Sequence, residues 1–169
     1  RWKVCARSFK NHRKLSTLVE NRTTYSAEYA ELNIYETHTF AEQVSLIFDF
    51  PVIASMLTVK KIMHLEGLPS FEFFPGESVV MPSSKPMVID FPIANEKNPT
   101  QCLALGIDEK KISDVVLNFN NYVAIENENN NWDLDANTSH LTNNQTVNHL
   151  VERLVYTSTN NNKSKDVLL

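Results

Sequence analysis

Between residues 30 and 107 the chain is a succession of short apolar runs, each separated from the next by a turn signal. The runs span 30–36, 44–50, 52–58, 60–65, 71–74, 78–81, 87–91 and 101–107. Several alternate apolar with polar residues, which is the pattern of a strand with one buried face. Turn sequences such as LEGLPS at 65–70 and PGES at 75–78 carry a glycine that supplies a positive φ. This spacing predicts a β-sandwich or β-barrel.

The hydrophobic period changes after residue 107. Asp108 has the position of an N-cap, and Ile112, Val115, Val116 and Phe119 follow at helical spacing. The Asn-rich stretch 125–141 has no period and is expected to be a loop. Thr142 and Gln145 have the spacing of a capping box at the start of a second helix. That helix carries one apolar stripe, formed by Val147, Leu150, Val151, Leu154 and Val155.

The order of these elements predicts a mainly β fold, a barrel or jelly roll, followed by two C-terminal helices. We divide the chain into a basic N-terminal arm or linker at 1–14, the barrel at 15–107 and the helical segment at 108–169. The apolar stripe of the second helix has two interpretations, because it can pack onto the barrel or pair with a second chain. The stripe is too short to indicate a coiled coil.

The search for catalytic and metal-binding motifs excludes several classes of protein. With three glycines in the chain, Gly-rich phosphate loops are excluded. No two histidines lie within four residues of each other, so a local pair of metal ligands is missing. Asp49 and Asp90 lie in predicted strands and could form a carboxylate pair, but a solvent-facing role is the commoner one for an aspartate in a strand. Cys102 reads as a small buried residue, because its neighbours in sequence include no base. We expect no metal and no cofactor.

Charge and cysteine usage bear on partners and location. Six of the 16 basic residues lie within positions 1–14, where there is no acid, so the remainder carries 10 basic and 20 acidic residues. The basic start is either an arm that binds nucleic acid or a solvated terminus; we favour the second, because the acidic remainder repels phosphate. Two distant cysteines indicate a reducing, cytoplasmic location, and no apolar run is long enough to cross a membrane.

The segment FFPGESVVMPSSKPM at 73–87 resembles the second conserved motif of the cupin fold. In metal-dependent cupins, the strand after the Pro-rich turn opens with a metal-binding histidine, and here that position holds Met87. The upstream histidine pair of those proteins is also missing, because no histidine lies between His38 and His64. The resemblance therefore implies a cupin-like barrel without its metal site.

Three segments together resemble the N-terminal regulatory domain of AraC-type bacterial transcription regulators: 20–38, 73–92 and 98–112. The resemblance continues into 149–169, which is similar to the helix and linker before the helix-turn-helix units of that family. It implies a barrel that binds a small-molecule effector, helices that form a homodimer, and DNA contact only through a C-terminal domain beyond this chain. We expect that domain to follow residue 169. The alternative is a small cupin enzyme, an isomerase or dioxygenase, with a non-standard site.

The family resemblance does not identify pocket residues in this sequence, so the candidates come from strand alternation alone. The side chains expected to face the barrel interior as an effector pocket are Phe48, Met56, His64, Phe73, Met87 and Phe91. A shift of one residue in register exchanges inside for outside. The set is aromatic and Met-rich, which suits an apolar or mixed ligand, but an interior simply filled with side chains is equally consistent with it.

Overall fold

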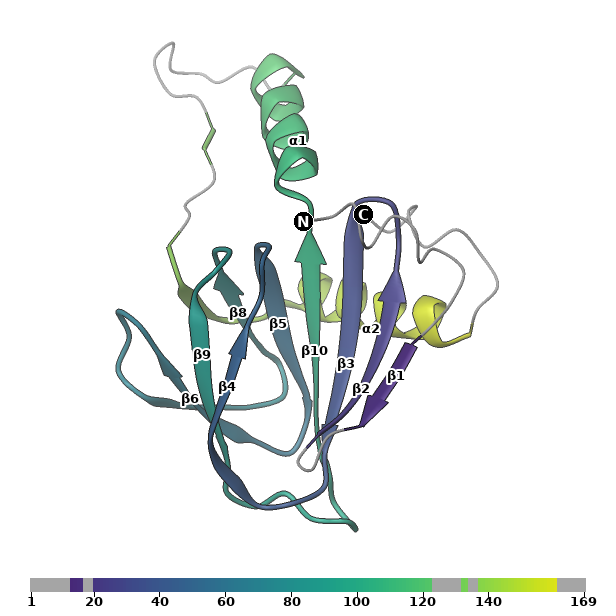
Figure 1. Ribbon diagram of the computed structural model, residues 1–169. Coiled ribbons are helices and arrows are strands. Elements are labelled where there is room, and N and C mark those ends of the chain that lie inside the picture. The colour runs from purple at the N-terminus through teal and green to yellow at the C-terminus, as the bar shows by residue number, and fades with distance from the viewer. Residues whose placement is uncertain (1–12, 17–19, 123–131, 134–136, 161–169) are drawn as a thin grey trace.

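The computed structural model describes residues 13–16, 20–122, 132–133 and 137–160. In this part of the chain, two antiparallel sheets face each other and two helices follow them in sequence (Figure 1). The larger sheet has the order β1 (Arg13–Ser16), β2 (Glu20–Ser26), β3 (Ala30–Thr37), β10 (Thr100–Ile107), β5 (Val52–Thr58), β8 (Glu77–Met81), β11 (Ser139–Thr142). The smaller sheet has the order β4 (Ala41–Ile47), β9 (Pro86–Phe91), β6 (Lys61–Leu65), β7 (Phe71–Phe73).

Strand alternation explains why the core lies between the sheets. On β6, Lys61, Met63 and Leu65 are buried, whereas Ile62 and His64 between them are partly exposed. Other strands contribute buried residues to the same cluster, and together these side chains form the main hydrophobic core. The chain therefore folds as a jelly roll whose interior is one continuous cluster.

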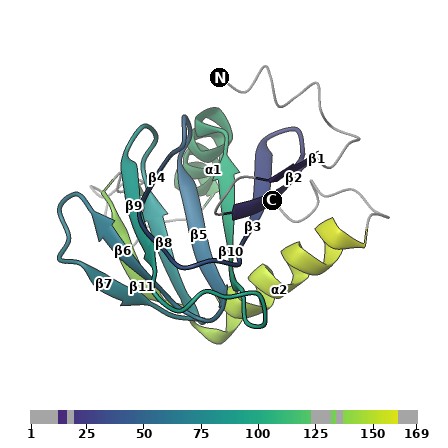
Figure 2. The ribbon, with the colours of Figure 1, turned by 60° about the horizontal axis from the view of Figure 1, so that its bottom comes forward.

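Helix α2 (Gln145–Thr159) covers the outer face of the larger sheet, as Figure 2 shows. Leu154 packs there with Leu32 of β3 and Leu103 of β10, and the three side chains are at most 9% exposed. A second, smaller core thus lies on the other side of β3 and β10. Both strands are buried on both faces. β10 is accordingly apolar at successive positions from Cys102 onward, whereas β3 alternates apolar with buried polar residues.

Helix α1 (Glu109–Tyr122) has no buried residue and extends beyond the end of β10 (Figure 1). The carboxylate of Asp108 accepts hydrogen bonds from the backbone N–H groups of Lys110 and Lys111, at 2.7 and 3.3 Å. This confirms Asp108 as the N-cap. None of the described helices has the length and apolar character that crossing a bilayer requires.

The predicted fold class, mainly β with two helices after the barrel, is confirmed, and each of the eight predicted strands is present. The positive φ angles of Gly67 and Gly76 confirm the two glycine turns. The strand predicted at 44–50 is displaced by three residues toward the N-terminus, since β4 begins at Ala41 and ends at Ile47. The N-terminal arm lies outside the described residues up to residue 12, and β1 begins at Arg13.

Two predictions near the second helix are wrong. Asn144, not Thr142, caps α2: its side-chain oxygen accepts from the N–H of Val147 at 2.9 Å. Thr142 instead ends β11, a strand inside the stretch that was expected to be a loop. The ring of His140 on β11 stacks on Phe71 with centroids 3.9 Å apart, and so joins the edges of the two sheets. A four-residue strand with little alternation escapes detection by period.

Candidate functional site

The space between the two sheets is occupied by adaptable side chains. All four methionines of the chain, Met56, Met63, Met81 and Met87, lie in this cluster and are at most 3% exposed. Methionine is unbranched and polarizable, so it repacks around differently shaped neighbours more readily than leucine or isoleucine. The interior is therefore a core with an unusual capacity to rearrange.

The structure places five of the six predicted pocket residues in this interior: Phe48, Met56, Phe73, Met87 and Phe91. The inward orientation expected for His64 is wrong. On β6 the inward positions belong to Lys61 and its alternate neighbours, so His64 lies on the opposite face of the small sheet. The error is one residue of register, the smallest that changes the face.

His64 belongs to a polar row on the outer face. Its Nε2 is 2.8 Å from Oδ2 of Asp90, and its Nδ1 is 2.7 Å from the hydroxyl of the exposed Ser70. The backbone N–H of Gln43, and secondarily His64, lower the pKa of Asp90 below its ordinary value. Asp90 contacts these groups and not Asp49, so the two aspartates do not form the carboxylate pair considered above.

A serine–histidine–aspartate row activates a nucleophile when oxyanion donors and a substrate cleft accompany it. Here the row joins β9, β6 and the loop before β7. The backbone N–H of Gln43, a residue with a φ of +55°, donates to the Asp90 carboxylate and holds it in place. We therefore interpret the row as a structural tie across the outer face of the small sheet.

The inner face of β2 and β3 carries a buried polar network. Thr24 donates from its hydroxyl to the side-chain oxygen of Asn33 at 2.8 Å, and the amide of Asn33 donates to Glu31 at 3.0 Å. Arg22 donates to Thr24 at 3.1 Å and lies 3.8 Å from Glu31. Asn33, at the centre, is 0% exposed. The inner face of β2 and β3 is thus polar around Asn33, whereas the four methionines of the core lie on β5, β6, β8 and β9.

A second polar group in the interior is Lys61, which is 2% exposed. Its Nζ donates to Sγ of Cys102, 3.1 Å away on β10, and lies 5.6 Å from the centroid of the Phe73 ring. Two positions from Cys102 on β10 is Thr100, 1% exposed, whose hydroxyl has no hydrogen-bond partner in the structure. Lys61 and Thr100 are thus buried polar groups with unused hydrogen-bonding capacity.

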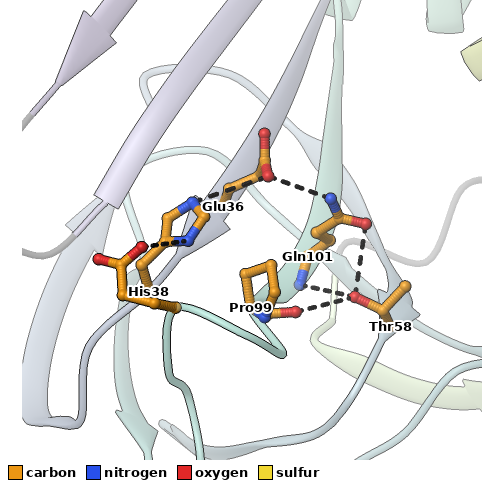
Figure 3. A network of polar contacts seen from close by, with 6 residues as sticks. Glu36, His38, Thr58, Pro99 and Gln101 are labelled. Carbon is orange, nitrogen blue, oxygen red and sulfur yellow. Dashed lines mark hydrogen bonds and ion pairs between the residues drawn. The ribbon is translucent and has the colours of Figure 1, made fainter.

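A rim of polar contacts holds the chain segments next to Lys61 (Figure 3). Thr58, at the end of β5, donates to the carbonyl of Pro99 at 3.1 Å and accepts from the N–H of Gln101 at 3.2 Å. The Gln101 amide donates to Glu36 at 3.1 Å, and His38 lies 3.7 Å from Glu36. These contacts fix the corner between β5 and β6, from which Lys61 enters the interior.

Among the residues that the structure describes, no group of three or more His, Cys, Asp or Glu side chains is arranged to hold a metal ion. Met87, at the position where metal-dependent cupins carry a histidine, is 2% exposed and packs in the core. The polar groups of the interior are instead hydroxyl, amide and amino groups, together with the Arg22 guanidinium and the Glu31 carboxylate, and such groups bind organic molecules through hydrogen bonds.

Comparison with known families decides the affiliation of the chain. The model described as "AraC-type transcriptional regulator N-terminus" matches residues 28–169, which is most of the sequence. The chain belongs to this family. The resemblance drawn from three short segments is thereby confirmed, and the chain is a regulatory domain of the AraC type. No curated protein sequence matches the chain significantly.

Solved structures show what this AraC-type domain shares in fold. AerE from Microcystis aeruginosa aligns with a TM-score of 0.51 and 9% identity over 59% of this chain and 46% of that one. Vicilin from Corylus avellana has the same TM-score, 12% identity, and coverage of 60% and 30%. An oxalate decarboxylase variant from Bacillus subtilis has a TM-score of 0.47, 15% identity, and coverage of 59% and 28%.

These identities establish similarity of fold alone, a cupin-like jelly roll. The chain aligns with less than half of AerE and less than a third of vicilin. The chemistry of the AraC-type domain therefore has to be argued from its own side chains.

The predicted dimerisation stripe on α2 has a part that packs on the large sheet and a part that is exposed. Leu154 is buried on the large sheet, and Val151 and Val155 pack beside it. Val147 and Leu150 lie nearer the start of the helix and are 36% and 50% exposed. Packing onto the barrel thus accounts for three of the five side chains. The other two remain available for the pairing that was predicted.

A groove of about 810 Å³ lies outside the barrel, between α1 and the chain that follows β8. Ile112 and Val116 line it from the helix, Pro82 and Ser83 from the other side, and Trp132 at one end. Its volume falls in the range of small-molecule sites. The groove is a place outside the barrel where a ligand has room.

Sequence reasoning missed Lys61, Thr100 and the polar wall on β2 and β3. The polar sequence of β2, ENRTTYS, has too little apolar alternation to predict a strand, so its inward threonine was not considered. Lys60 and Lys61 are consecutive, and alternation alone places one of them inside, but a lysine is normally assigned to solvent. Only the register of the strand identifies which lysine is buried.

Proposed function

We propose that this chain is the effector-sensing and dimerisation domain of an AraC-type regulator, without enzymatic activity of its own. A small molecule binds between the two sheets, and two copies of the domain pair through helical surfaces. The bound state is passed to a DNA-binding domain elsewhere in the full-length protein, in the cytoplasm. DNA is contacted only through that second domain.

The observation that carries this proposal is the polar network inside the barrel. Burying Asn33, Thr24 and Glu31 next to an apolar core costs free energy that an all-apolar interior avoids. Specific small-molecule sites combine a mostly apolar lining with a few fixed polar groups. The methionine cluster and the network beside it have this composition, and the methionines supply the adaptability that ligand entry requires.

The strand β3 offers a short route from the pocket to the helices. Asn33 faces the interior, and its neighbours Leu32 and Ile34 belong to the cluster that holds α2 on the outer face. Because successive strand residues point to opposite faces, a ligand that shifts Asn33 also shifts the seat of α2. A ligand with different affinity for two α2 positions changes their populations, which is the energetic basis of the switch.

The effector half is tested by thermal shift on the purified domain with sugars, aromatic acids and fatty acids. A ligand of the barrel raises Tm by several degrees when its concentration is about a hundredfold above Kd. In Asn33→Ala the wall of the pocket is lost, so the shift disappears. In Ser55→Ala, which removes a buried hydroxyl from the outer face, the shift is retained. A shift lost in neither variant, or in both equally, contradicts binding in the barrel.

The dimerisation half is tested by sedimentation at tens of micromolar protein, where the domain is expected to be a dimer. Leu150→Glu places a carboxylate on the exposed apolar surface of α2 and is expected to give monomers. His149→Glu is the matched control: it adds the same charge on the opposite side of the helix, where the His149 side chain is 68% exposed, and leaves the dimer intact. A monomeric parent domain refutes this half directly.

A further inference from the structure

Two consecutive lysines of this chain have opposite environments. Lys60 is at the surface and forms an ion pair with Glu72 of β7. Lys61 points into the interior, is 2% exposed, and has two contacts, the sulfur of Cys102 and the ring of Phe73. No carboxylate of the described residues lies within ion-pair distance of Lys61. Among the described residues, the surface lysine thus has an anionic partner and the buried lysine has none.

A buried ammonium group without an anion is costly. A lysine carries three N–H donors, and here a single weak acceptor, the thiol sulfur, takes one of them. Folded proteins rarely bury lysine unless it is paired, because removing its charge from water costs several kcal/mol. The arrangement is therefore incomplete as a structural feature, and it lacks a negatively charged acceptor.

Thr100 is an independent sign of a missing partner in the same region. Its hydroxyl is buried and accepts or donates no hydrogen bond, although most buried hydroxyl groups are paired. Thr100 and Cys102 are two positions apart on β10 and so face the same side of the sheet, about 7 Å from each other along the strand. Thr100 therefore adds a second unpaired hydrogen-bonding group on the strand whose Cys102 contacts Lys61.

The backbone that delivers Lys61 is also strained. Val59, in the two-residue corner between β5 and β6, has a φ of +64°, a conformation that is rare for a β-branched residue. Such strain persists where surrounding contacts impose it, and it is concentrated at functional sites. The contacts of Thr58 with Pro99 and Gln101, which Figure 3 shows, hold the end of β5 next to this corner.

We propose that Lys61 and Thr100 bind the carboxylate of a small organic acid whose apolar or aromatic body lies among Phe73 and the methionines. This deepens the proposed function, because it names the chemical class of the effector. A carboxylate matches the single positive charge of Lys61 and accepts charge-assisted hydrogen bonds from Nζ and from the Thr100 hydroxyl. Phosphate carries more charge than one lysine neutralises, and a neutral sugar leaves the ammonium group uncompensated.

Matched acid and amide probes test the class of ligand. Phenylacetate and octanoate are compared with phenylacetamide and octanamide, which have the same bodies without the charge, by thermal shift and calorimetry on the purified domain. At least one acid is expected to bind, and its amide to bind roughly tenfold to a hundredfold more weakly. If the amide binds as tightly as the acid, the carboxylate has no special role and the inference is overturned.

Substitutions at the two lysines test the site. In Lys61→Met the affinity for the acid is expected to fall roughly tenfold to a hundredfold, and in Lys60→Met, the matched surface control, to be unchanged. Methionine suits the apolar surroundings of residue 61, so circular dichroism should show a folded protein. Thr100→Val, which keeps the shape of the side chain, is the second variant and is expected to weaken binding of the acid.

The outcomes separate this inference from the proposed function. If a compound binds and its affinity depends on Asn33 but not on Lys61, the barrel site stands and the carboxylate assignment falls. If binding depends on Trp132 in a Trp132→Ala variant and not on Lys61, the ligand lies in the groove beside α1, and the barrel assignment falls as well. If acids bind and Lys61→Met and Thr100→Val both weaken them while Lys60→Met does not, the inference is upheld.

Discussion

The two faces of the large sheet treat buried polar groups differently. On the outer face, Leu103 of β10 packs against Leu154 of α2, and the buried hydroxyls of Ser55 and Ser78 lie 2.6 Å apart and satisfy each other. On the inner face, β10 presents Thr100, whose buried hydroxyl has no hydrogen-bond partner in the structure. One strand therefore contributes to a completed interface on one side and to an incomplete one on the other.

This difference indicates how each face is used. An interface that is complete within the chain contributes its full free energy to stability. An interface with unused donors gives up part of that free energy, and recovers it when a ligand supplies the missing groups. By this criterion the outer face is built for stability. The inner face, with Lys61 and the network around Asn33, is built for binding.

The largest effect is expected on the outer face. Leu103 is 1% exposed between β3 and α2, so Leu103→Ala should lower the free energy of unfolding by about 3 kcal/mol, through lost burial and the cavity that remains. Urea unfolding followed by circular dichroism measures this change. Ligand affinity in the barrel should be preserved in the folded fraction, since Leu103 faces away from the interior.

Leu117→Ala is the control for the Leu103 substitution. Leu117 is 60% exposed on α1, and removing the same side chain there should change the unfolding free energy by less than about 0.5 kcal/mol. If the two leucine variants unfold at the same urea concentration, the outer face does not have the stabilising role assigned to it, and the contrast between the two faces is lost.

Most of the fold could be predicted from the sequence, because its strands are short, bounded by turn residues and well separated in period from the helices. Gly76 illustrates this: a glycine after proline between two apolar runs indicates a tight turn, and the residue adopts a φ of +88°. β1, β2 and β11 were missed because none of them has a clear apolar alternation. All three are recruited by pairing with neighbouring strands, a tertiary contact that a local pattern does not contain.

The sequence predicted which apolar side chains fill the interior, but not which polar side chains face it. Alternation correctly assigned Phe73 and Met87 to the barrel, since large apolar side chains have one favourable face. It failed for His64 and Lys61, because both are polar and the pattern KKIMHL permits either register. The register of β6 follows from the two-residue connection between β5 and β6, in which Val59 has a positive φ. A sequence pattern does not predict a positive φ at a valine.

The smallest stability change is expected on the inner face and is the most informative. Thr100 is 1% exposed and its hydroxyl has no partner, so Thr100→Val removes a desolvated polar group and loses no hydrogen bond. The free energy of unfolding should stay within about 0.5 kcal/mol of the parent or rise slightly. Ser55→Ala, on the outer face, breaks the contact with Ser78 and leaves one hydroxyl alone, at a cost of about 1–2 kcal/mol.

Urea unfolding of the two variants side by side gives the comparison directly, since each loses one buried hydroxyl and little volume. Thr100→Val as destabilising as Ser55→Ala would mean that the hydroxyl of Thr100 already has a partner in solution, such as a bound water. In that case the inner face would be as complete as the outer one. An unchanged or more stable Thr100→Val that binds acids more weakly means instead that the hydroxyl serves the ligand and not the fold, because its removal affects binding alone.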